Sequence, residues 1–351
     1  MRKIGKYIYG IIDFNTDFHL CASKSSSESS TTVEGCEVER VYTIPYRDVS
    51  AVVSDSEIVD YTSLPKDVVA RYLIRHQRII EKVMENLTII PMRIGTFAYD
   101  AGEVSYILSK GCRLIKEIFD RISDKIEIDV AATWSDLNLI LKEVGEEEEI
   151  KVFKESLLVN SGGVTVDDQM KVGVMVKKAL DTKRERTALE IQKELKNISQ
   201  DFRIHELMDD KMVANVAFLI NKSDHKDFER IIEELNARFN EKLNFRCVGP
   251  LPPYSFYTLE VKKFSFEEID WARKRLGLVK DFVAKGEIKK AHQALAFALH
   301  PDKNPNTPGI EREFDEVTKA YKTLWEYCQG EGCSFDEEEF KKNSILVRVK
   351  E

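Results

Sequence analysis

One short stretch of this 351-residue chain combines an imidazole, a carboxylate and an ammonium group: HPDKNP, His300 to Pro305, directly after the helix-like run GEIKKAHQALAFAL. An imidazole, a rigid proline and a carboxylate follow one another as His300, Pro301 and Asp302. Such a turn can present a partner-binding surface, or it can be a capped connection between two helices. The sequence has no Gly-rich phosphate loop, no GxSxG and no HExxH, so we expect no enzyme.

The remaining histidines and cysteines give no sign of a metal or cofactor. The histidines are dispersed, and His76 lies on an apolar helix face, which favours a packed core histidine. The cysteines show no paired ligand spacing of the kind that binds zinc. Scattered cysteines in a large chain are typical of a reducing compartment, so the cytoplasm is expected. The six are Cys21, Cys36, Cys112, Cys247, Cys328 and Cys333.

The overall composition excludes two classes of partner. A net charge of -8 and a pI near 5.5 argue against nucleic acid. No uninterrupted run of about 18 apolar residues exists, so no membrane span is expected. The start, MRKIGKYIYGIID, contains only a short apolar stretch that Asp13 ends, and it predicts a first strand, not a signal peptide.

The first part, 1–134, is predicted to be an α/β domain. Its apolar residues alternate or run together in four expected strands, within 6–13, 38–55, 86–100 and 125–134. Two amphipathic helices are expected between them, near 69–83 and 104–119. The polar stretch SKSSSESSTT (23–32) predicts a loose loop, to which no function is assigned.

Four further segments complete the expected domain order. A helical connector (135–210) contains an acidic solvated run and a long charged helix. Strand, helix and two strands over 211–263 predict a ferredoxin-like α/β domain. Three amphipathic helices occupy 264–330, and alternating apolar residues in the tail 331–351 could add an edge strand. The fold class is therefore α+β: two α/β domains joined by helices, plus a C-terminal helical region.

Two short stretches contain residues that restrict the backbone. PMRIGTF (91–97) places Arg93 inside an expected strand, and GPLPPYSF (249–256) places three prolines between two strand halves. On a structural interpretation Gly95 is a bulge or a bend and the prolines stiffen a connection. On a functional interpretation they form a rigid ledge that exposes Tyr254 and Phe256 to a partner.

Three motifs together resemble a known family. KYIYGII, IIPMRIGTF and VGPLPPYSF, in this order and separation, are similar to the gas vesicle GvpL/GvpF family over roughly residues 5 to 263. The resemblance implies a non-enzymatic assembly component that contacts the shell protein GvpA and other minor Gvp proteins. Its candidate family-motif or partner-binding residues are Tyr9, Gly10, Pro91, Arg93, Gly95, Gly249, Pro250, Pro252, Pro253, Tyr254 and Phe256.

The region 265–328 resembles a J domain, with a short helix, a long helix, the His-Pro-Asp turn and a second long helix. In that family the turn and a basic preceding helix engage a DnaK-type chaperone. The positions that are commonly basic are Gln293, Ala294 and Ala298 here. Because neutral side chains cannot hold an acidic partner, structural or shell-directed use of the fold is favoured over ATPase stimulation. An apolar helix of this kind is also expected to be covered.

The leading hypothesis is therefore a cytoplasmic, gas vesicle-associated assembly protein that binds shell subunits. The alternative is a J-domain co-chaperone that stimulates a DnaK-type ATPase and uses its α/β module to bind clients. An enzyme of unrecognised mechanism is the third hypothesis.

Overall fold

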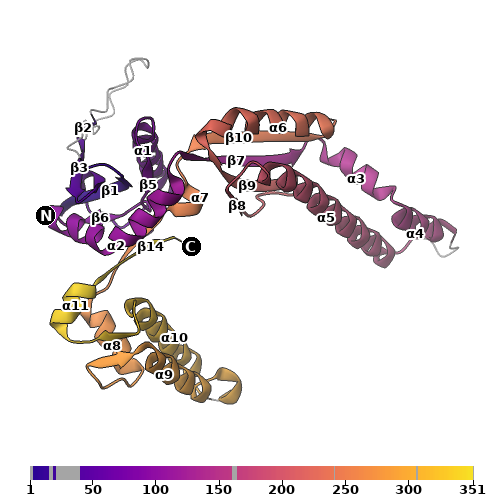
Figure 1. Ribbon diagram of the computed structural model, residues 1–351. Helices are drawn as coiled ribbons and strands as arrows, with labels where there is room; N and C mark the ends of the chain where they lie inside the picture. The colour runs from indigo at the N-terminus through magenta and orange to yellow at the C-terminus, as the bar shows by residue number, and fades with distance from the viewer. Residues whose placement is uncertain are drawn as a thin grey trace. The chain divides into compact units, whose positions relative to one another are not determined.

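The computed structural model describes residues 3–15, 19–20, 40–159, 164–240, 242–305 and 307–350, so the serine-rich loop at 23–32 lies outside the described residues. The chain divides into two compact units (Figure 1). The first unit contains Met1–Ile79, Met92–Ile118 and Leu259–Glu351, and the second contains Ile80–Pro91 and Phe119–Thr258. No helix among the described residues is long and apolar enough to cross a membrane.

The sheet of the first unit is built on the buried strand β1 (Ile4–Ile12). Its antiparallel strands run in the order β2-β3-β4-β1, and β6 also pairs with β1. The other strands are β2 (His19–Leu20), β3 (Val41–Tyr46), β4 (Val49–Glu57) and β6 (Phe97–Ala98). Helices α1 (Lys66–Met84) and α2 (Ala101–Ile122) form where the apolar stripes predict them.

One predicted strand is interrupted. The stretch 86–100 forms only the short strands β5 (Ile89–Pro91) and β6, so the expectation that Arg93 lies inside a strand is wrong. The chain turns between them at Gly95, whose φ of +82° is a left-handed conformation that favours glycine. Arg93 therefore lies at the start of a turn, with its side chain exposed.

The second unit is ferredoxin-like, as expected, but it is assembled from other strands than predicted. Its elements follow the order β-α-β-β-α-β, and the antiparallel sheet has the order β10-β7-β9-β8. The strands are β7 (Lys125–Trp134), β8 (Asp201–Ile204), β9 (Met212–Asn221) and β10 (Leu243–Leu251). The helices are α3 (Leu137–Gly145), α4 (Glu148–Val159), α5 (Val166–Lys196), α6 (His225–Arg238) and the short α7 (Tyr254–Tyr257).

Two strands thus belong elsewhere than the sequence suggested. Strand β7, expected to close the first sheet, pairs with β9 and β10 in the second unit. The strand at 259–263, expected in the ferredoxin-like domain, pairs in the first unit instead. Side chains alternate across β7, so that Ile126 and Ile128 face the main core of the second unit while Glu127 and Asp129 face the opposite side.

The remainder of the first unit begins and ends with paired strands, β11 (Leu259–Lys263) and β14 (Ile345–Val349). Between them lie the predicted helices and a short hairpin, β12 to β13. Ser265 caps the first helix by accepting a hydrogen bond from the Glu268 amide at 3.1 Å. The elements are α8 (Phe266–Arg275), β12 (Phe282–Ala284), α9 (Lys285–Ala298), α10 (Ile310–Tyr327), β13 (Gly332–Ser334) and α11 (Glu337–Asn343).

Truncating the core of this helical region is expected to unfold it. Leu324 of α10 is fully buried against Ile288 and Val317, so Leu324→Ala should cost about 2–5 kcal/mol through the cavity that it leaves. The same change at the exposed Leu189 of α5 should stay within about 0.5 kcal/mol. Thermal unfolding of both variants tests this, and equal melting curves would show that α10 is not part of a packed core.

Candidate functional site

The His-Pro-Asp turn is a locally capped connection between α9 and α10. The His300 Nδ1 accepts a hydrogen bond from the Asp302 amide at 3.2 Å, and Pro301 opens a single 3-10 turn. Asn304 donates to the carbonyl oxygens of Ala298 and His300 at 2.8 and 3.1 Å, which satisfies the end of α9. The side chain of Asp302 is 89% exposed and that of His300 45%, so both remain accessible to a partner.

The outer face of α9 is apolar where a J domain is commonly basic. Gln293, Ala294 and Ala298 are exposed, and Phe297 between them is 70% exposed. The Lys303 ammonium lies over the Phe297 ring. The expectation that this face is covered is therefore wrong, because no other described element of the first unit buries these four side chains. Apart from Lys303, which follows the helix, the positive charges of α9 that lie exposed are Lys289 and Lys290, nearer the start of the helix.

The residues of the KYIYGII motif are buried around His76. The Tyr7 hydroxyl donates to His76 Nδ1 at 2.8 Å, and His76 Nε2–H donates to the Met92 carbonyl at 3.0 Å, an assignment that requires neutral imidazole. Burial lowers the pKa of His76 to about 4. The prediction of a packed core histidine is confirmed. Tyr9 is equally buried, and the register of β1 shifts between Ile8 and Gly10.

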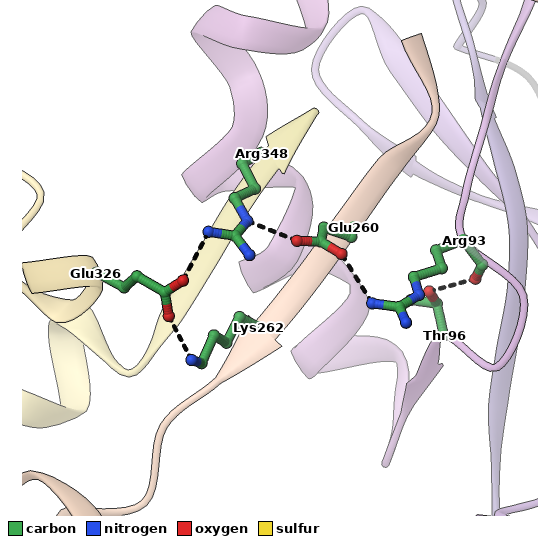
Figure 2. A network of polar contacts seen from close by, with 6 residues as sticks. All are labelled: Arg93, Thr96, Glu260, Lys262, Glu326 and Arg348. Carbon is green, nitrogen blue, oxygen red and sulfur yellow. Dashed lines mark hydrogen bonds and ion pairs between the residues drawn. The ribbon is translucent and has the colours of Figure 1, made fainter. Parts of the chain in front are cut away.

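Arg93 of the PMRIGTF motif belongs to a chain of ion pairs (Figure 2). It binds Glu260 of β11 at 2.9 Å, and Glu260 also accepts from Arg348 of β14 at 2.5 Å. Arg348 in turn binds Glu326 of α10 at 2.9 Å, and Lys262 binds the other oxygen of Glu326. Although burial alone would raise it, the pKa of Glu260 is lowered by its hydrogen bonds from Arg348 and Arg93.

The GPLPPYSF segment packs against the sheet of the second unit. The Ser255 amide and hydroxyl both donate to the Glu127 carboxyl, at 2.8 and 2.7 Å. The other side of the Ser255 hydroxyl lies 3.1 Å from His205 Nε2. Phe256 packs on Ala217 and Leu219 of β9. The Ser255 hydroxyl lies between the carboxyl and the imidazole, whereas in a catalytic triad the imidazole lies between the serine and the carboxylate.

Glu127 is almost fully buried, and this changes its acidity. The pKa of Glu127 is raised to about 8. Burial is the largest cause and the neighbouring Asp129 carboxyl adds to it, whereas the hydrogen bonds from Ser255 lower the pKa. Burial also raises the pKa of Asp129, one of whose buried oxygens has no hydrogen-bond donor. Burial thus favours the protonated form of both carboxyls. Sequence reasoning missed this pair, although two acids alternating with apolar residues in KIEIDVA were the signal.

The candidate residues thus fall in three separate places. Arg93 and the His-Pro-Asp turn belong to the first unit, whereas residues 249–256 belong to the second. Most motif residues are buried, namely Tyr9, Gly10, Pro91, Pro252, Pro253 and Phe256, while Gly249 and Pro250 are exposed and Gly95 and Tyr254 are half-buried. In the described part of the chain, no three His, Cys, Asp or Glu side chains converge as a metal site would require.

Replacing Glu127 should change how stability depends on pH. The folded-state pKa near 8 lies above the ordinary value of about 4.3, so between these values the unfolded state binds fewer protons and stability falls as pH rises. The Glu127 carboxyl lowers the free energy of unfolding by at most about 1.4 kcal/mol for each pH unit of this rise. In Glu127→Gln this contribution should disappear. Urea unfolding at pH 5, 6.5 and 8 measures it, with the exposed Glu233→Gln as a control that keeps the wild-type slope. Parallel curves for wild type and Glu127→Gln would contradict the assignment.

Comparison with known proteins assigns the two parts of this chain. The model of the family described as gas vesicle synthesis protein GvpL/GvpF matches residues 5–258, and the DnaJ domain model matches residues 274–327. Gas vesicle protein F1 of Halobacterium salinarum is 22% identical over 259 residues, which are 73% of this chain and 93% of that protein. The crystal structure of GvpF from Anabaena sp. has a TM-score of 0.58 at 20% identity, over 72% of this chain and 97% of that chain.

The helical region has its own relatives. Chaperone protein dnaJ GFA2 of Arabidopsis thaliana is 51% identical over 49 residues, 14% of this chain and 10% of that protein. Both resemblances read from the motifs are confirmed, and so is the α+β fold class. This chain belongs to the gas vesicle synthesis protein GvpL/GvpF family and carries a DnaJ domain after its family region.

Proposed function

We propose that this protein is a non-enzymatic assembly factor of gas vesicles, which binds the shell protein GvpA and other minor Gvp proteins in the cytoplasm. The observation that carries the proposal is the family match over 5–258, which spans nearly all of the second unit and the sheet of the first. Relatives of this chain bear the name gas vesicle protein F.

The buried motifs limit where the partner surface can be. Tyr9, Pro252, Pro253 and Phe256 are buried, which favours a role in supporting the fold over a role in partner contact. The exposed motif positions are Arg93, Gly249 and Pro250. We place shell-protein contacts on the exposed positions, and binding of purified GvpA to wild type and to Pro250→Ala tests this. Equal affinity would move the contact to another surface.

A second candidate function is stimulation of a DnaK-type ATPase. The exposed His300 and Asp302, in a segment that matches the DnaJ domain model, favour it. The exposed apolar face of α9 opposes it, because charge that would hold an acidic partner is missing from three positions. The proposal of an assembly factor does not depend on this activity.

The turn can be tested separately from the fold. Asp302→Asn changes an exposed group and should cost within about 0.5 kcal/mol, so vesicle formation should persist in a host that lacks the wild-type gene. Leu324→Ala, which removes core packing, should abolish it. Steady-state ATPase of the host's DnaK-type chaperone is measured in parallel. If Asp302→Asn eliminates vesicles at normal protein level and the wild type accelerates the ATPase, the co-chaperone function replaces our proposal.

A further inference from the structure

After residue 258, two segments of the first unit are covered by neither family model. They are 259–273 and 328–351, on either side of the DnaJ match. Strands β11 and β14 lie within them and pair antiparallel over five residues, from Leu259 opposite Val349 to Lys263 opposite Ile345. The helical region therefore begins and ends at adjacent points. Residues 264–344 are therefore an insertion between the two strands of a β-hairpin, and not a domain on a single linker. We name them the inserted region.

The hairpin is fixed to the rest of the first unit through its backbone. The Arg93 amide donates to the Leu259 carbonyl at 2.7 Å, and Met92 forms a parallel bridge with the same residue. On the other strand, Val347 packs on Gly111 of α2, where a Cβ would lie 3.0 Å from the valine side chain. A glycine at this point of α2 lets β14 approach the helix closely.

The charged side chains of the hairpin join three elements in one network (Figure 2). Glu260 is only 8% exposed and is held on both oxygens by arginines, one from the turn after β5 and one from β14. Glu326 receives Arg348 and Lys262, so α10 of the inserted region is tied to both strands. Paired, partly buried charges of this kind are directional, and removing one partner leaves the other buried without compensation.

Contacts from α2 reach both ends of the inserted region. The Tyr106 hydroxyl donates to the Lys341 carbonyl at 3.0 Å, and Lys110 donates to the Asn343 side chain at 3.3 Å. Glu103, one turn before Tyr106, forms an ion pair with Lys263 at 2.7 Å. The entry and exit of the inserted region thus rest on the same helix.

We infer that the inserted region is a fixed part of the first unit, held by the β11–β14 hairpin, with Glu260 and Arg348 as its positioning residues. The His-Pro-Asp turn then has a defined place relative to the N-terminal sheet. A partner that binds the turn is therefore held in one orientation relative to that sheet. This inference concerns the geometry of the chain and holds whether or not the proposed function is correct.

A distance measurement between the two parts tests the inference. Spin labels on ketone-bearing amino acids, which leave all six cysteines in place, are introduced at the exposed Arg113 of α2 and Lys290 of α9. Pulsed electron paramagnetic resonance should give one narrow distance distribution for the full-length protein. A reference variant carries six-residue Gly-Ser linkers after Lys263 and before Ile345, each of which adds a reach of about 14 Å. Its distribution should be at least about two-fold broader.

The positioning residues are tested in the same way. Glu260→Gln with Arg348→Met should broaden the distribution toward that of the linker variant. The matched control is Arg230→Met with Glu234→Gln, an exposed pair on α6, which should leave it unchanged. Circular dichroism shows whether each variant is folded. If the distance distribution of the wild-type sequence is as broad as that of the linker variant, the inference is overturned. This comparison does not depend on whether the Glu260→Gln and Arg348→Met variant folds.

Discussion

The pairing of β11 with β14 is the constraint on which the first unit depends. It brings together residues 259 and 349 of the chain and places Glu260 between two arginines. A buried carboxylate is tolerated only when such partners compensate its lost hydration. The hairpin and its neighbours therefore hold the inserted region through contacts with Met92 and Arg93 and with α2, where a linker would give a single flexible attachment. The hairpin also explains why Arg93, a residue of the family-like motif, is exposed yet held in place.

The second unit uses a different solution for its buried acids. Among the residues that the structure describes, no arginine is hydrogen-bonded to Glu127. Burial therefore raises its pKa, and hydrogen bonds from Ser255 fix the position of its carboxyl. The two glutamates thus show opposite directions of pKa shift for one physical reason. Where cations are present the charged form is retained, and where only a hydroxyl and an amide are present the neutral form is favoured.

The sequence predicted the elements better than their pairing. Apolar stripes located α1, α2 and α10 because helix periodicity is a local property. Strand β7 was placed in the wrong sheet, because alternation identifies a strand without identifying its partners. Arg93 was expected in a strand, since the left-handed Gly95 that turns the chain looks like any strand glycine in the sequence. The contact of Glu260 with Arg348 spans 88 positions, and no local pattern reports it. The residues of the His-Pro-Asp turn were found directly because three consecutive side chains define it.

The first unit is discontinuous: after a short excursion at Ile80–Pro91, the chain leaves it again at Ile118, builds most of the second unit, and returns at Leu259. This order has a consequence for synthesis on the ribosome. Residues 119–258 emerge together, so the ferredoxin-like sheet can close while β14 is still unmade. Strand β11 has no partner strand, and Gly111 of α2 has no Val347 against it, until β14 is translated. The first unit is thus the first part of the molecule to be begun and the last to be completed, and a nascent chain that stalls before β14 exposes β11 as an unpaired strand edge.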